Sequence, residues 1–87
     1  MTWELAFSMA VAKDAKNLAA AGLKEKTQTL LDVLRGNPWQ NPPPYEKLVG
    51  ELAGANSRRI NRQHRLVYRV NEDTHGIDIL RMWTHYE

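Results

Sequence analysis

The spacing of the apolar residues changes along this chain, and that change is what most constrains its fold. Trp3, Leu5 and Phe7 alternate with polar or small residues, which predicts a short strand with one apolar face. Helical spacing follows as far as position 34, and strand-like alternation is clear from position 58. The pattern predicts one α+β domain over residues 1–87 in the order β-α-α-β-β-β-β, with a two-helix hairpin packed on a mainly antiparallel sheet.

Two helices are predicted from apolar stripes and from end signals. Ser8 is expected to cap the first helix, because its hydroxyl can accept from a free amide of the first turn, and Gly22 to end it in a left-handed conformation. Gly36 and Pro38 are expected to end the second. The stripes are Val11, Ala15, Leu18 and Ala19 in the first helix and Leu23, Thr27, Leu30, Leu31 and Leu34 in the second.

The second half is expected to supply most of the sheet. Its first segment, residues 37–45, is rich in proline, and the three prolines at 42–44 favour a stiff, extended connector that holds Glu46 in a fixed place. Candidate strands follow at 47–52, 58–60, 65–70 and 77–83. The last is apolar on both faces, as expected for a strand inside the sheet.

Positive charge is concentrated in one stretch of the chain. Residues 58–69 hold five of the 12 lysines and arginines, together with His64 and no acid, so seven basic residues stand against 10 acidic ones elsewhere. A basic stripe on an acidic body is typical of a site for a polyanion. Arginines that face water on a pair of strands would give the same pattern, so this observation alone leaves both interpretations open. The five arginines are Arg58, Arg59, Arg62, Arg65 and Arg69.

Several classes of protein are disfavoured by what the sequence lacks. It has no cysteine, which excludes disulfides and thiolate zinc sites, and its three histidines show no metal-ligand spacing. It has neither a serine nucleophile elbow nor a phosphate-binding glycine loop. We therefore expect no metal or cofactor. No apolar run approaches the roughly 20 residues of a membrane span, and the first residues lack a basic signal-peptide region, so a cytoplasmic protein is expected.

The remaining polar residues match the needs of RNA cleavage without a metal. That reaction needs a base for the ribose 2′-hydroxyl, a cation for the charge that develops at phosphorus, and an acid for the leaving 5′-oxygen. Glu46, the arginines and His85 offer these three roles. Taken singly, Glu46 is also typical of a solvated surface acid and His85 of a chain end.

One stretch resembles a known family. SRRINRQHRLVYRV at residues 57–70 resembles the YoeB/Txe family of bacterial toxins, within the RelE/ParE superfamily. EKL at 46–48, ELAG at 51–54 and the terminal His85-Tyr86 also fit that family. The resemblance covers roughly residues 44–87 and is only architectural before them. Val49 departs from it, because the family often has a lysine there.

The resemblance implies a RelE-like fold and a ribosome-dependent endoribonuclease that cuts mRNA in the A site. The matching residues would make Glu46 the general base and His85 the general acid, while Arg59 and Arg65 contact the phosphate and Tyr86 helps to place the substrate. The site residues expected are Glu46, Arg65 and His85 as catalytic residues and Arg59 and Tyr86 as substrate-binding residues, with Arg58 added as a further substrate-binding residue of the same basic stripe.

The resemblance also implies partners. They are a cognate antitoxin similar to YefM, the ribosome with its mRNA and, because toxins of this kind are often dimeric, a second copy of the chain, with no membrane involved. Two alternatives remain open: a ParE-like toxin that inhibits gyrase, and a module that binds nucleic acid without cutting it. Glu46 and the His85-Tyr86 end favour the nuclease.

Overall fold

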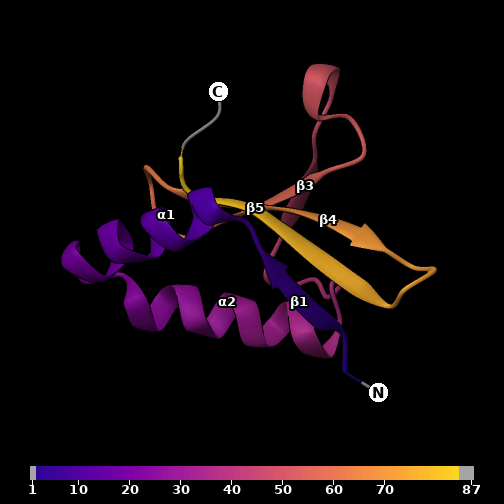
Figure 1. Cartoon of the computed structure of the whole chain (residues 1–87), viewed down its shortest axis with the longest axis horizontal. Helices are drawn as coiled ribbons and strands as arrows, with labels where there is room; N and C mark the ends of the chain where they lie inside the picture. Colours follow the sequence, from indigo (N-terminus) through magenta and orange to yellow (C-terminus); the bar gives the residue numbers. More distant parts are fainter. Residues whose placement is uncertain (1, 85–87) are drawn as a thin grey trace.

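The chain folds into two helices and a five-stranded sheet (Figure 1). The structure is a computed structural model and describes residues 2–84. Its elements are β1 (Glu4–Phe7), α1 (Met9–Ala20), α2 (Lys24–Gly36), β2 (Tyr45–Lys47), the short 3₁₀ helix η1 (Gly50–Leu52), β3 (Asn56–Arg59), β4 (Arg65–Asn71) and β5 (Gly76–Thr84). This order confirms the predicted α+β architecture.

The sheet has the strand order β1-β5-β4-β3-β2. Strands β2 to β5 pair in sequence with antiparallel neighbours, and β1 pairs with β5 in parallel. The prediction of a mainly antiparallel sheet is therefore confirmed. β5 has a paired strand on each side, so the last strand lies inside the sheet, as expected.

The two helices form where their end signals predicted. Ser8 caps α1, with its Oγ accepting from the amide of Val11 at 3.2 Å, and Gly22 follows the helix with a φ of +76°. No helix in the described part of the chain is long and apolar enough to cross a membrane. The apolar faces of both helices meet the sheet in one core, formed by Val11, Leu18, Leu30, Leu31, Leu34, Ile60, Leu66, Tyr68, Ile77, Ile79 and Met82.

A buried carboxylate joins α1 to β5. Asp14 is 3% exposed and accepts from Nε and Nη2 of Arg81 at 2.9 and 3.1 Å and from the amide of Met82 at 3.1 Å. The polar residue lies in the middle of an apolar helix face, and its two partners are 67 and 68 positions away in the sequence. Asp14 therefore fixes α1 against the C-terminal part of β5.

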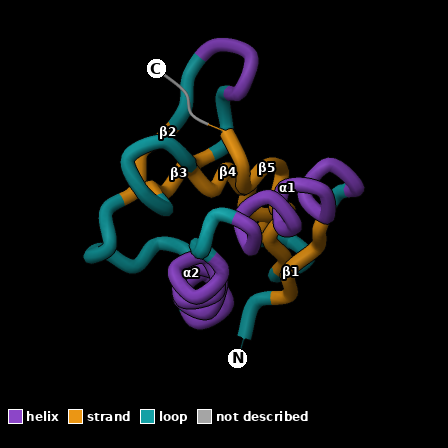
Figure 2. Tube along the Cα trace, turned by 90° about the vertical axis from the view of Figure 1, so that its left-hand side faces the viewer, coloured by secondary structure: helices purple, strands orange, loops and turns teal. Residues whose placement is uncertain are grey.

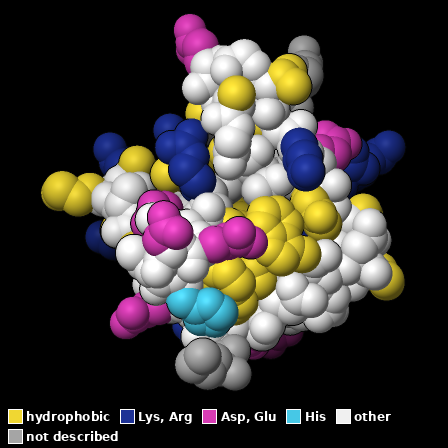
Figure 3. Space-filling model, turned by 90° about the vertical axis from the view of Figure 1, so that its right-hand side faces the viewer, with side chains coloured by type: hydrophobic (Ala, Val, Ile, Leu, Met, Phe, Trp, Pro, Cys, Tyr) yellow, Lys and Arg dark blue, Asp and Glu magenta, His cyan; other side chains and the backbone are white. Residues whose placement is uncertain are grey.

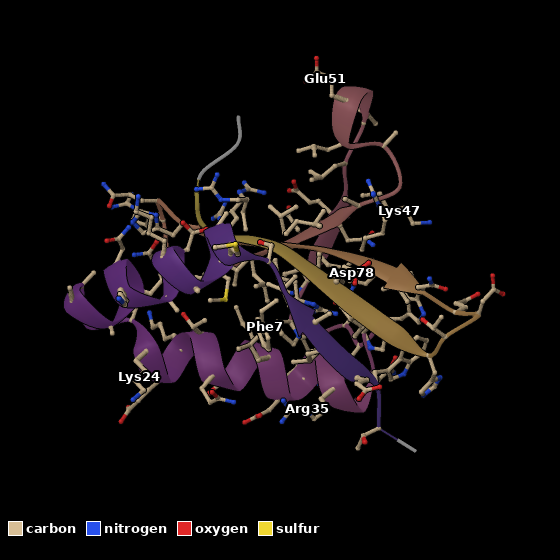
Figure 4. All side chains as sticks on the ribbon, viewed as in Figure 1. Phe7, Lys24, Arg35, Lys47, Glu51 and Asp78 are labelled. Atoms are coloured by element: carbon tan, nitrogen blue, oxygen red, sulfur yellow. The ribbon has the colours of Figure 1, made fainter. Side chains whose placement is uncertain are left out.

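The prediction of a strand at residues 47–52 is wrong. Strand β2 ends at Lys47, and residues 50–52 form η1 instead. Gly50 and Gly54 have φ values of +72° and +93°, and the reversals that they allow lift residues 48–54 out of the sheet. Figure 2 shows this loop projecting away from both helices, and Figure 4 shows Glu51 at its outer end.

Candidate functional site

The three strands β2, β3 and β4 present different chemistry on their two faces. Residues directly opposite each other in paired strands share a face, and successive residues alternate between faces. Tyr45, Arg58 and Leu66 are paired across the three strands and form the inner face, toward the core. Glu46 is opposite Ser57 on the outer face, where Arg59 and Arg65 also form a pair.

Glu46 and Arg65 form an ion pair on this outer face. Nη1 of Arg65 lies 3.0 Å from Oε2 of Glu46 and 3.4 Å from the hydroxyl of Ser57. The side chain of Glu46 is 68% exposed and that of Arg65 is 18% exposed, so a carboxylate that solvent reaches lies beside a largely covered cation. Within the described residues, Nε and Nη2 of Arg65 have no acceptor, which leaves donors for an anion.

Arg59 completes the cluster from the neighbouring strand. It is directly opposite Arg65 in the register of β3 and β4, and it is exposed. Within residues 2–84 its side chain makes no hydrogen bond or ion pair. Like charges opposite each other in a sheet repel, and an anion bound between them removes the repulsion. Glu46, Ser57, Arg59 and Arg65 are called the outer-face site below.

Arg58 does not belong to that site. Its side chain is 1% exposed and lies on the inner face. The guanidinium donates from Nε to the hydroxyl of Tyr68 at 3.1 Å, from Nη2 to the carbonyl of Pro38 at 2.9 Å, and from Nη1 to the carbonyl of Pro43. The expectation that Arg58 binds substrate is therefore corrected, because its donors are engaged inside the protein. Strand alternation contains the signal: two consecutive arginines in one strand must point to opposite faces.

The inner face also shifts the pKa of a buried tyrosine, Tyr68. Tyr68 has no exposed surface, and its hydroxyl donates to the carbonyl of Pro38 at 3.3 Å. Burial raises the pKa of Tyr68 above its ordinary value of 10.0, and the positive charge of Arg58 opposes that rise in part. The hydroxyl therefore stays protonated and remains available to donate.

The two remaining arginines of the basic stripe contribute no polar contact to the outer-face site within the described residues, and the last two expected site residues lie outside that part of the chain. Arg62 and Arg69 are exposed, in the β3–β4 turn and on β4, and neither contacts Glu46. His85 and Tyr86 lie outside the described residues. Thr84, the residue before His85 in the sequence, is opposite Arg65 in the register of β4 and β5. The structure therefore brings together Glu46, Arg59 and Arg65, and it adds Ser57, which the sequence did not single out.

A hollow of about 570 Å³ elsewhere on the molecule has a charge opposite to that of the outer-face site. Figure 3 shows the side of the molecule where hydrophobic side chains gather beside acidic ones. The hollow contains one basic and three acidic residues, so it is poorly suited to a polyanion. It is lined by Trp39, Arg69, Val70, Asn71, Glu72, Asp73 and Asp78.

Comparison with known proteins identifies the family. The family model described as YoeB-like toxin of bacterial type II toxin–antitoxin system matches residues 12–86. The chain belongs to this family. Toxin YoeB of Mycobacterium bovis and toxin RelK of Mycobacterium tuberculosis are each 39% identical to it over 57 residues, which are 66% of this chain. The match spans 65% of the length of each of these relatives.

Solved structures of the family share the whole fold. The YoeB/ParE toxin from Agrobacterium tumefaciens is 28% identical, with a TM-score of 0.85 over 95% of this chain and 99% of its own. YoeB in the YoeB–YefM complex from Staphylococcus aureus is 32% identical, with a TM-score of 0.78 over 97% and 98%. A YoeB dimer from the same organism matches with the same scores.

Proposed function

We propose that this chain is the toxin of a type II toxin–antitoxin pair and cleaves mRNA on the ribosome by acid–base chemistry that needs no metal. The observation that carries the proposal is the ion pair of Glu46 and Arg65, 3.0 Å apart on an accessible face with Arg59 directly opposite. A base and two cations on the same face of neighbouring strands are the groups that attack by a ribose 2′-hydroxyl on the neighbouring phosphate requires.

In this mechanism the outer-face site accepts the proton of the 2′-hydroxyl and stabilises the negative charge that develops on the phosphate. Glu46 accepts the proton of the 2′-hydroxyl as that oxygen attacks phosphorus. Arg65 keeps one nitrogen on Glu46 and turns its other donors to the phosphate oxygens, and Arg59 binds the phosphate from the facing strand. Because Arg65 is largely covered, its interaction with the developing negative charge is weakly screened by solvent.

His85 is proposed as the acid for the leaving 5′-oxygen, and Tyr86 as a residue that places the substrate. Both are proposed from the sequence, in which they directly follow Thr84, the strand residue opposite Arg65. A histidine has an ordinary pKa of about 6.5, so a useful fraction carries a proton near neutral pH.

A cognate antitoxin is the proposed partner that keeps the toxin inactive. The Staphylococcus aureus relative is described in complex with YefM and also as a dimer. We extend both kinds of partner to this chain: an antitoxin similar to YefM and, in its absence, a second copy of the toxin. Co-expression with the neighbouring reading frame, followed by size-exclusion chromatography, tests both.

Primer extension on mRNA from induced bacteria tests the activity. Induction of the wild-type chain is expected to arrest growth and to give cuts at codons occupied by ribosomes. Glu46→Gln keeps the size and the hydrogen-bonding ability of the side chain but removes the base, so cleavage is expected to fall by about 10²- to 10⁴-fold. Cuts of equal strength with the variant would contradict the role of Glu46.

Gyrase inhibition is the second candidate, because the Agrobacterium tumefaciens neighbour is described as a YoeB/ParE toxin. It predicts loss of supercoiling activity with purified gyrase and no cut mRNA. The same protein preparation can be used in both assays, so the two functions are separated directly.

A further inference from the structure

The buried guanidinium of Arg58 ties the Pro-rich connector to the sheet. Its bonds to the carbonyls of Pro38 and Pro43 reach across 20 and 15 positions of the sequence, to both parts of the segment that joins α2 to β2. Its third bond is to the hydroxyl of Tyr68 in β4. These contacts of Arg58, Pro38, Pro43 and Tyr68 are called the Arg58 clamp.

The clamp acts on the strand that carries Glu46. The guanidinium carbon of Arg58 lies 5.0 Å from the centre of the Tyr45 ring, over its face, and Tyr45 is opposite Arg58 in the register. Glu46 is the next residue, and its opposite, Ser57, is the residue before Arg58. The clamp therefore fixes the Tyr45–Arg58 pair, which directly adjoins the Glu46–Ser57 pair on one side, from the inner face.

Strand β2 has little else to hold it. It has three residues, it lies at the edge of the sheet, and it pairs only with β3. Its other neighbour in sequence is the projecting loop, where Val49 is 86% exposed. So short an edge strand frays unless something outside its own ladder holds it.

We propose that Arg58 is a positioning residue for the reaction: through the clamp it holds Glu46 at 3.0 Å from Arg65. The inference rests on the proposed function, in which Glu46 is the base. Arginine suits this role because its planar fork donates from three separate nitrogens to acceptors that lie apart, whereas lysine carries all its donors on one nitrogen. Within the described residues no carboxylate pairs with Arg58, so the cation is held by neutral oxygens and by a ring face.

The test is Arg58→Lys, which keeps the charge and removes the fork. Arg35→Lys is the matched control, because Arg35 is 47% exposed on α2, on a different part of the ribbon from Lys47 of β2 (Figure 4). Cleavage of mRNA on programmed ribosomes gives kcat and the ribosome concentration at half-saturation. We expect kcat of Arg58→Lys to fall by about 10- to 100-fold, because misplacing a catalytic group by about 1 Å has an effect of that order. The ribosome concentration at half-saturation should change less than twofold.

Amide hydrogen exchange supplies the second readout. In Arg58→Lys, those amides of residues 45–47 that donate to β3 should exchange faster than in the wild type, while the paired amides of β5 should keep their protection. A folded Arg58→Lys with wild-type kcat and protected amides at 45–47 would overturn the inference. If Arg58→Lys does not fold, Tyr68→Phe takes its place, since it removes only one member of the clamp; a two- to fivefold loss of kcat is expected, and no loss would overturn the inference.

Failure of this inference differs from failure of the proposed function. If the wild type cuts no mRNA, or if Glu46→Gln cuts as well as the wild type, the proposed function fails. Exchange at residues 45–47 then decides whether Arg58 holds β2. If the wild type cuts and Glu46→Gln does not, the kcat of Arg58→Lys decides the positioning role.

Discussion

Two neighbouring arginines on β3 illustrate the difference between the two faces of the sheet. Arg58 points inward, has 1% of its surface exposed and donates three hydrogen bonds to groups inside the protein. Arg59 points outward, opposite Arg65 and on the face that carries Glu46. The same residue type is structural at one position and available to an anion at the next, because side chains alternate along a strand.

The two faces also differ in what their charges do for stability. Desolvation of the Arg58 cation is offset by its three hydrogen bonds, and those acceptors in turn depend on it. The Glu46–Arg65 pair has one partner that is mostly in solvent, and such pairs contribute at most about 1 kcal/mol. Two arginines opposite each other are unfavourable in themselves. Stability therefore does not explain the outer-face site, which agrees with the anion-binding role that we propose for it.

The largest expected difference is in the stability of matched variants. Arg58→Met leaves the carbonyl of Pro43 without its donor and a gap beside Tyr68, so the free energy of unfolding is expected to fall by about 2–4 kcal/mol. Arg59→Met changes an exposed side chain and is expected to stay within about 0.5 kcal/mol of the wild type. Urea denaturation followed by tryptophan fluorescence measures both. Equal losses would contradict the division between the two faces.

The next effect is on the rate of cleavage. Arg65→Ala removes the cation beside Glu46 and is expected to slow mRNA cleavage on ribosomes by about 10²-fold or more. Arg69→Ala, which changes another arginine of the same strand, lies beside the acidic hollow and serves as the control. Single-turnover kinetics at saturating ribosomes compares them. If the two variants slow the reaction equally, general loss of positive charge would explain the effect better than a localised site.

A smaller effect concerns the pH dependence of stability. Burial raises the pKa of Tyr68 above 10.0, so above pH 10 the unfolded chain loses this proton while the folded chain retains it. Fewer protons are then bound in the unfolded state, and the contribution is lost as pH rises through the folded pKa. Between pH 10 and pH 11.5, the free energy of unfolding of Tyr68→Phe should fall less steeply than that of the wild type. Parallel slopes would contradict a raised pKa.

The sequence predicted the fold better than the details of the site. The helix cap at Ser8, the left-handed Gly22 and the apolar strand β5 are local signals, and all appear as expected. The prediction of a strand at 47–52 was wrong because the backbone reversals at Gly50 and Gly54, both with positive φ, outweigh the strand preference of the apolar residues around them.

The site residue that was missed, Ser57, depends on strand register, which local patterns do not show. Ser57 reaches Arg65 only because β3 pairs with β4 in one particular register. Arg58 was assigned to substrate because it lies in a basic stripe. Strand alternation places it on the face opposite to that of Arg59, and two of its three acceptors are backbone carbonyls that no sequence pattern indicates. Glu46 and Arg65 are 19 positions apart, and the resemblance to a family suggested their proximity before the structure showed it.

In the proposed mechanism, the nucleophile at the outer-face site is a ribose 2′-hydroxyl. The most direct measurement is cleavage on the ribosome of a matched pair of mRNAs that differ only in one 2′-deoxy nucleotide on the 5′ side of the cut. The all-ribose mRNA should be cut to give a 5′ fragment that ends in a 2′,3′-cyclic or 3′-phosphate, and the 2′-deoxy mRNA should remain intact at that position. Equal cutting of both mRNAs, or a 5′ fragment that ends in a 3′-hydroxyl, would contradict the mechanism.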